Sequence, residues 1–141
     1  MLSAEDIAAA EDRIRPFIHR TPLVYSPTFS EMTGCFVYLK LETLQKAGSF
    51  KVRGATNVIL QHRSLIGPAG VVAASAGNHA QGVALAARGA GVRATIVMPV
   101  GSSVSKQEAT RGYGAEVVLA GRNLEESVKY ARMLEERGLY F

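Results

Sequence analysis

Tryptophan is absent from the sequence, cysteine occurs once, and no run of like charge exceeds a pair. The single cysteine, Cys35, excludes an internal disulfide and cannot build a zinc site by itself. Because it lies in the β-rich stretch CFVYLKLE, we expect it to be a small buried apolar residue. No apolar run reaches the roughly 18 residues that span a bilayer. The N-terminus, MLSAEDIAAAEDRIR, also lacks the basic segment and apolar core of a secretory signal. These absences predict a cytoplasmic protein without a membrane partner.

The composition that remains is typical of a globular domain. Apolar residues make up 48% of the 141 residues and charged residues 20%, which is enough for one ordinary domain with a buried core. Sixteen Lys and Arg outnumber twelve Asp and Glu, giving a net charge of +4, and they are spread along the chain. Nucleic-acid-binding proteins more often gather their basic residues on one face. We therefore expect no nucleic-acid partner.

The first half of the chain predicts a helix, two strands and a second helix. Ser3 and Asp6 form a capping-box pattern for a first helix that ends before Pro16. PLVYS and CFVYLKLE each predict a strand. The turn cluster IGPAG at 66–70 is the strongest boundary signal in the chain. It divides the chain into an incomplete segment, 1–69, and a small α/β domain, 70–141.

Beyond this boundary the pattern becomes regular, with apolar strands alternating with helices. The predicted strands are VVAAS, ATIVMP and AEVVLAG, and the predicted helices are NHAQGVALAARGAG, SKQEATRGYG and NLEESVKYARMLEERG. In the last helix, Asn123 and Glu126 form a second capping-box pattern. Strands without strict alternation, separated by helices, indicate an α/β fold of three layers, with an open parallel sheet covered by helices on both faces. LYF at 139–141 predicts a fourth strand, and we expect the chain to be a piece of a larger protein.

The stretch GSFKVRGA places Lys51 in the first turn of a predicted helix, with Ser49 as the expected N-cap. The helix dipole disfavours a cation there by a few tenths to about 1 kcal/mol, and Gly54 costs about 1 kcal/mol relative to alanine. Positive potential and desolvation favour a neutral lysine, and a neutral lysine is the nucleophile that forms a Schiff base. Taken alone, a lysine in a helix is more often a solvated surface residue.

A second loop, SAGNHAQG, lies where the first regular strand ends and its helix begins. Helix N-termini at the carboxyl ends of parallel strands point free N–H groups at anions. Ser75 and Asn78 add side-chain donors, and Gly77 allows close approach of a ligand to the backbone. This arrangement predicts a site for a carboxylate or a phosphate. Alternatively, Asn78 is a plain N-cap and His79 a helix residue with a satisfied imidazole.

Three motifs, QKAGSFKVRGA, SAGNHAQGVA and MPVGSSVSKQEATRGYGAEVVLAG, resemble the fold-type II pyridoxal-phosphate enzymes. The resemblance is strongest to the threonine ammonia-lyases, also called threonine dehydratases, with serine racemase as a near relative. It implies that Lys51 holds pyridoxal 5'-phosphate as a Schiff base and moves the substrate Cα proton. It further implies that Phe50 lies beside the cofactor ring, that Asn78 binds the cofactor's phenolic oxygen, and that the 75–79 loop grips the substrate carboxylate. The residues of that loop are Ser75, Ala76, Gly77, Asn78 and His79.

The implied reaction is dehydration and deamination of L-threonine, and of L-serine, to a 2-oxo acid and ammonia by a homo-oligomer. Serine racemases resemble SSGNH where this chain has Ala76, so elimination is favoured over racemisation. The sequence departs from the family pattern at Ala47, where threonine is usual, and at Ser102 and Ser103, where Ala-Pro is usual. The family's glycine-rich phosphate loop would lie beyond Phe141, so we expect the 141-residue chain to be inactive alone.

Two alternatives stay open at this point. Within the enzymes, the chain belongs to a serine racemase or another pyridoxal-phosphate β-eliminating lyase. Outside them, it is a non-catalytic α/β domain, shortened by truncation, that acts by self-association or partner binding, because exposed strand edges favour pairing with another chain.

Overall fold

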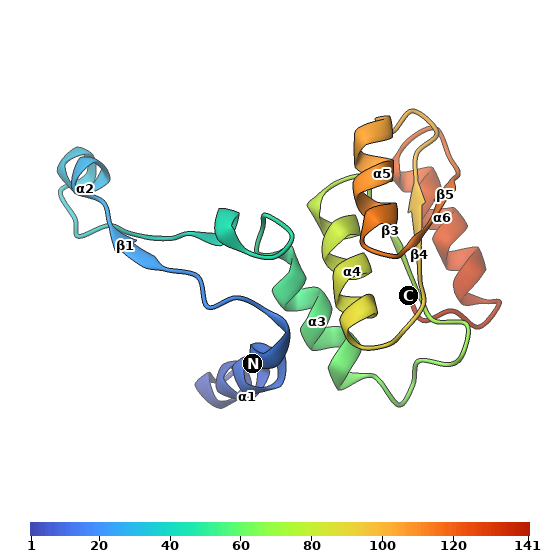
Figure 1. Ribbon diagram of the computed structural model, residues 1–141, viewed down its shortest axis with the longest axis horizontal. Coiled ribbons are helices and arrows are strands. Elements are labelled where there is room, and N and C mark those ends of the chain that lie inside the picture. The colour runs from blue at the N-terminus through green and yellow to red at the C-terminus, as the bar shows by residue number, and fades with distance from the viewer.

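The computed structural model describes residues 1–141, which form a layered α/β unit and, nearer the N-terminus, a segment that protrudes from it (Figure 1). The elements follow in the order α1 (Ala4–Ile14), η1 (Arg15–Phe17), β1 (Leu23–Tyr25), α2 (Pro27–Thr33), β2 (Tyr38–Lys40), η2 (Glu42–Leu44), α3 (Lys51–Gln61), β3 (Val71–Ala74), α4 (Asn78–Gly89), β4 (Ala94–Met98), α5 (Val104–Gly112), β5 (Glu116–Leu119) and α6 (Leu124–Glu135). The alternation of strands and helices after residue 70 confirms the expected α/β class.

The α/β unit is built on a parallel sheet in the order β3-β4-β5. Val72 of β3 lies opposite Thr95 of β4, and β4 pairs with β5 in the same direction. On the free edge of β3, Tyr140 forms one parallel bridge with Val71. The fourth strand predicted at 139–141 is therefore present only as this single bridge.

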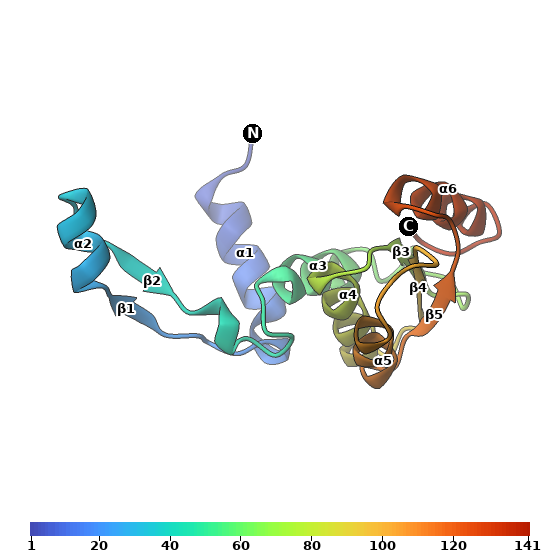
Figure 2. The same cartoon turned by 90° about the horizontal axis from the view of Figure 1, so that it is seen from above.

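Helices cover both faces of the sheet, with α6 on one side and α4 and α5 on the other (Figure 2). Side chains of β4 alternate between the two layers. Ile96 and Met98 belong to the cluster shared with α4, whereas Val97 between them packs with Ala131 of α6. All three β4 side chains are inaccessible to solvent. Burial on both faces explains why this strand is apolar throughout rather than alternating.

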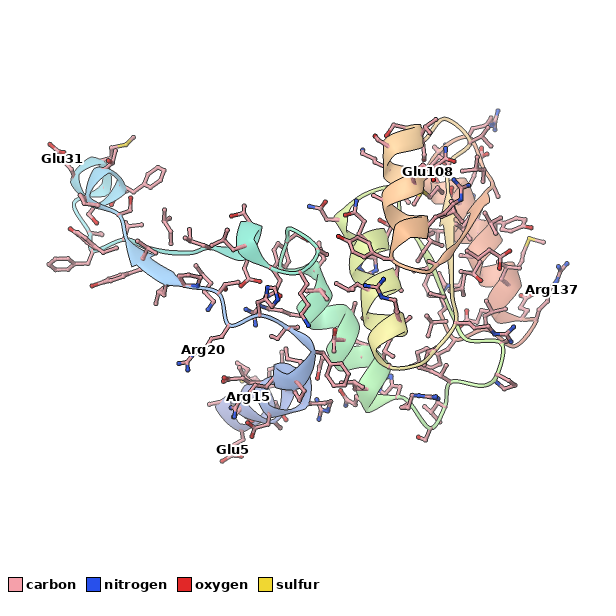
Figure 3. The ribbon with its side chains drawn as sticks, viewed as in Figure 1. Glu5, Arg15, Arg20, Glu31, Glu108 and Arg137 are labelled. Carbon is pink, nitrogen blue, oxygen red and sulfur yellow. The ribbon has the colours of Figure 1, made fainter.

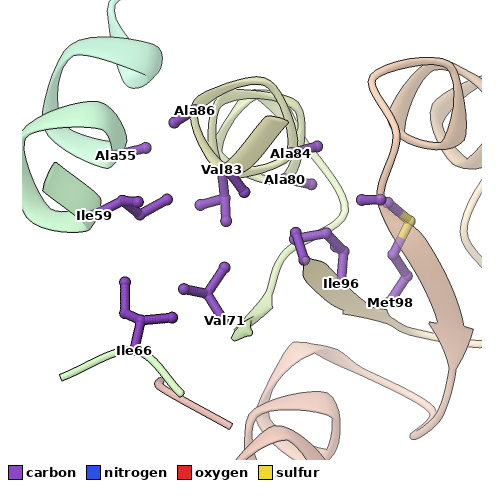
Figure 4. Close-up of a cluster of buried hydrophobic side chains, with 13 residues drawn as sticks. Ala55, Ile59, Ile66, Val71, Ala80, Val83, Ala84, Ala86, Ile96 and Met98 are labelled. Carbon is purple, nitrogen blue, oxygen red and sulfur yellow. The ribbon is translucent and has the colours of Figure 1, made fainter. Parts of the chain in front are cut away.

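Helix α3 shares the main core with the α/β unit. Ala55 and Ile59 of α3 pack with Val83 and Ala86 of α4 in one buried cluster (Figure 4). The small alanine side chains let the two helices approach closely. A domain boundary at residue 70 stays a prediction, because the core continues across it.

The arm, which we define as residues 23–40, consists of β1, α2 and β2. The two strands pair only with each other, antiparallel, with Tyr25 opposite Tyr38. The strands are three residues long, shorter than PLVYS and CFVYLKLE predicted, because neither face of the ribbon is buried. Cys35 is exposed, so its expected burial is wrong. Figure 3 shows Glu31 at the far end of the arm.

The predicted helix caps are present with one exception. Ser3 and Asp6 form both bonds of the capping box of α1. Asn123 accepts a hydrogen bond from the Glu126 amide, but the Glu126 carboxylate accepts from the Arg122 amide instead of that of Asn123. The second capping box is thus only half formed. None of the helices has the length and apolar character needed to cross a bilayer.

Candidate functional site

Lys51 is the first residue of α3, and Phe50 is its N-cap. The expectation that Ser49 caps this helix is wrong, since no side chain accepts from its first amides. The Lys51 side chain is exposed, and its Nζ lies 4.9 Å from the centroid of the Phe50 ring. Contact with the face of an aromatic ring stabilises a cation. The amine and the aromatic ring therefore form one exposed unit at the start of α3.

The Ser49 hydroxyl, two residues before Lys51, is buried and has no hydrogen-bond partner. Leaving a buried hydroxyl unpaired costs about 1 to 3 kcal/mol. Only 8% of Ser49 is exposed. The hydroxyls of Thr56 and Ser102 are likewise buried and unpaired, but of the three only Ser49 lies next to the first turn of α3.

The loop of residues 75–79 offers four hydrogen-bond donors to an anion. The Ser75 oxygen accepts from the amides of Gly77 and Ala80, each at 3.3 Å, so its own proton is free to donate. The amides of Ala76, Asn78 and His79 have no acceptor in the chain. The positive end of α4 adds to the attraction for an anion.

The structure corrects the simpler interpretation of Asn78. Gly77 is the N-cap of α4, and Asn78 is the first helical residue. The Asn78 side chain is exposed and caps nothing. Its amide is therefore available to a ligand.

Helices α3 and α4 bring the two loops together. A Cβ placed on Gly82 of α4 would lie 3.0 Å from the carbonyl carbon of Lys51 and 3.0 Å from the Val52 nitrogen. Backbones approach this closely only where one residue lacks a side chain. Gly82 thus fixes the start of α3 against the first turns of α4. The sequence motifs did not single out this glycine, although a glycine inside a helix is itself a signal of close packing.

His79 belongs to the same site. Partial desolvation of the ring, and secondly the nearby Lys51 charge, hold the pKa of His79 below its usual value. The imidazole borders an apolar cavity of about 160 Å³ between α3, β3 and α4, where Ile59 and Val83 are among its neighbours. The lowered pKa favours the neutral form of the His79 imidazole.

We predict that Ser75→Ala lowers both stability and anion binding. The variant loses the oxygen that accepts two amide hydrogens, a loss of the N-cap kind that costs about 1 kcal/mol and shifts Tm by about 4 °C in a chain of this size. Thermal unfolding monitored by circular dichroism measures this shift. The matched control is Ser103→Ala, because Ser103 is the N-cap of α5 but makes no cap bond. An equal Tm shift in both variants would contradict the capping role of Ser75.

Comparison with protein-family models identifies the chain. The model described as "Pyridoxal-phosphate dependent enzyme" matches residues 14–141. The chain belongs to this family. Its members depend on pyridoxal phosphate, so the recognition of the family from the three motifs is confirmed.

Within this family, the chain is similar to individual lyases and racemases. L-threonine ammonia-lyase of Thermotoga maritima is 50% identical over 137 residues, which are 97% of this chain and 34% of the relative. Among solved structures, a threonine deaminase from T.th. matches with a TM-score of 0.82 and 45% identity, over 97% of this chain and 43% of that one. Maize serine racemase matches with a TM-score of 0.85 and 37% identity, over 95% of this chain and 41% of that one. The chain thus spans between one third and somewhat over two fifths of these relatives.

The residues at the site fit pyridoxal phosphate. The cofactor is an aldehyde with a phenolic oxygen and a phosphate, and the chain offers an exposed amine next to an aromatic ring. The Asn78 side chain is exposed and not engaged in capping, and the Ser49 hydroxyl has no partner. Residues that hold the cofactor phosphate are not evident among those described.

Proposed function

We propose that the protein is a pyridoxal-phosphate-dependent lyase that dehydrates and deaminates L-threonine, and L-serine, to 2-oxobutanoate or pyruvate and ammonia. The observation that carries the proposal is the close approach of Gly82 of α4 to the Lys51 backbone, which supports a shared site for Lys51 and the four donors of the 75–79 loop. The similarity to a relative named L-threonine ammonia-lyase supports the choice of substrate.

In this proposal each residue of the chain has a separate task. When bound, pyridoxal phosphate acts as an electron sink for the charge left at the substrate Cα. Lys51 holds the cofactor and takes the Cα proton. The Ser75 hydroxyl and the three free amides hold the substrate carboxylate, which orients the Cα–H bond toward the Lys51 amine. Asn78 contributes its side-chain amide to the cofactor's phenolic oxygen, and the Phe50 ring borders the cofactor.

Ala76 favours elimination over racemisation. Racemisation needs an acid on the face opposite Lys51 that returns a proton to Cα. A methyl group at position 76 offers no such proton. The likeness to maize serine racemase keeps a racemase, or another β-eliminating lyase, as the second candidate.

Product analysis with L-threonine and L-serine, on a protein of the full length of the relatives, tests the proposal. We expect 2-oxo acid and ammonia in equal amounts and no D-serine. The Ala76→Ser variant places a hydroxyl at this position, and we expect it to form D-serine measurably while 2-oxo acid formation continues. Chiral chromatography of the amino acids and a 2-oxo acid assay give both rates. D-serine from the unchanged protein at a rate comparable to 2-oxo acid would replace the lyase with a racemase.

The exposed side chains of the arm support association of this chain with other polypeptide. The exposed apolar ones are Leu23, Val24, Tyr25, Phe29, Met32, Phe36, Tyr38 and Leu39. Exposed apolar side chains gathered on one segment in this number are normally covered by polypeptide. We infer a homo-oligomer in the cytoplasm, in which residues 1–69 belong to the larger cofactor domain and residues 70–141 form the smaller one. If the protein binds neither cofactor nor substrate and instead associates through the arm, the non-catalytic alternative replaces the lyase.

A further inference from the structure

An ion-pair network lies at the base of the arm, outside the site described so far. Arg53 of α3 donates two hydrogen bonds to the Glu42 carboxylate, from Nε at 2.8 Å and from Nη2 at 2.7 Å. The Thr21 hydroxyl donates to the same carboxylate at 2.5 Å. Lys40 Nζ donates to the Thr21 carbonyl at 2.6 Å. The network thus joins three segments that are distant in the sequence.

The network is largely shielded from solvent. Thr21 is 4% exposed, and the side chains of Glu42 and Arg53 are 16% and 29% exposed. Bidentate arginine–carboxylate pairs in such surroundings are geometrically specific. The bonds from Arg53 lower the pKa of Glu42 to about 2, so the carboxylate stays charged at any pH at which the protein would work.

A second attachment lies close to the first. The Gln45 side chain donates to the His19 carbonyl and accepts from the His19 amide, both at 2.9 Å. The segment that leads from η2 into α3 is therefore held against residues 19–21 at Glu42 and at Gln45. Only residues 46–50 separate these attachments from the first residue of α3, Lys51.

The position of Arg53 on α3 allows the network to hold the first turn of this helix. Helical residues two apart lie roughly 200° around the axis from each other, so Arg53 and Lys51 point to nearly opposite sides. The first turn of α3 has no side-chain cap that would fix its rotation locally. The Arg53–Glu42 pair holds this turn from one side, and Gly82 of α4 limits it on another.

We propose that Thr21, Glu42 and Arg53 are positioning residues that fix the rotation of α3 and thereby the direction of the Lys51 amine. The role in catalysis rests on the proposed function of Lys51. The direction of the Lys51 amine, however, can be tested without a cofactor. The network also links the arm to Lys51, since Lys40 of β2 and Thr21, two residues before β1, belong to it.

Two readouts test this on the protein with Glu42→Gln, Arg53→Gln and the double variant. The first is the rate of acetylation of Lys51 by a water-soluble acetylating reagent relative to Lys46, followed by peptide mass spectrometry without cofactor. The second is the rate at which pyridoxal phosphate and borohydride label Lys51. We expect each single variant to change the acetylation ratio at least about 3-fold and to slow the labelling about 10-fold. Because the two residues act as one unit, the double variant should be no worse than either single one.

The control is Glu126→Gln, which removes another bidentate pair, with Arg122, on a helix far from Lys51 in sequence. We expect this variant to match the unchanged protein in both readouts. Arg53→Lys should restore the acetylation ratio only in part, because lysine keeps the charge without the two-pronged geometry. Thermal unfolding of all variants separates a loss of position from a loss of fold.

The outcomes are distinct. An unchanged acetylation ratio in folded Glu42→Gln and Arg53→Gln proteins would overturn the positioning role. So would additive effects in the double variant. If pyridoxal phosphate does not label the unchanged protein but the acetylation ratio shifts as expected, the positioning role stands and the proposed function fails.

Discussion

Lys51→Ala is expected to abolish the covalent adduct with pyridoxal phosphate and, in a protein of the full length of the relatives, to lower turnover of L-threonine by about 10³-fold or more. The variant removes the only amine that follows Phe50 in the first turn of α3 and, with it, the base that takes the Cα proton. General acid–base catalysis alone contributes about 10²- to 10⁴-fold, and loss of the covalent step adds to this. The intact mass after incubation with pyridoxal phosphate and borohydride reduction reports the adduct directly.

The matched control for this prediction is Lys46→Ala. Lys46 is also exposed and lies five residues earlier, but it has no aromatic ring contact. We expect it to keep one adduct per chain. If the unchanged protein forms no adduct, or if Lys51→Ala retains it, Lys51 does not hold the cofactor and the proposed function loses its central residue.

The regular half of the fold was predictable because local and global signals agree there. Val72 and Val97 lie on strands buried on both faces, so their apolar runs without alternation are themselves the signal of a covered parallel sheet. The arm was less predictable. Its strands contain residues with high β-propensity, but the propensity of Tyr25 and Tyr38 does not reveal that they pair only with each other. For the same reason the burial of Cys35 was predicted wrongly.

The site was predictable where its residues are neighbours in the sequence. The motif around Lys51 and the loop from Ser75 each carry their own helix start, so the sequence indicates both. How close the two helix starts lie depends on tertiary packing at Gly82, which neither motif reveals by itself. The network of Glu42 and Arg53 was missed because its partners are far apart in the sequence and each, taken alone, is an ordinary surface charge.

Gly82 gives the second large expected effect, through packing rather than chemistry. In Gly82→Val, the Cβ alone would lie 3.0 Å from the Lys51 carbonyl carbon and 3.2 Å from its Cβ. Because the nearest atoms belong to the backbone, α3 must move away from α4, and overpacking of this kind costs about 1 to 3 kcal/mol. We expect a Tm lower by about 4 to 12 °C and an adduct at Lys51 that forms at least about 10-fold more slowly. Thermal unfolding and intact mass measure the two effects.

Gly54 of α3, unlike Gly82 of α4, has space for a side chain. A Cβ on Gly54 meets no atom within 4 Å, so Gly54→Ala should raise stability by about 0.5 to 1 kcal/mol, as alanine does in a helix interior. If Gly54→Ala raises Tm but slows the Lys51 adduct, Gly54 keeps space for the cofactor. If Gly82→Val does not lower Tm, close contact at Gly82 does not hold Lys51 in place. Opposite shifts, with slow labelling only where α3 is displaced, would show that the reactivity of Lys51 depends on the packing of α3 against α4.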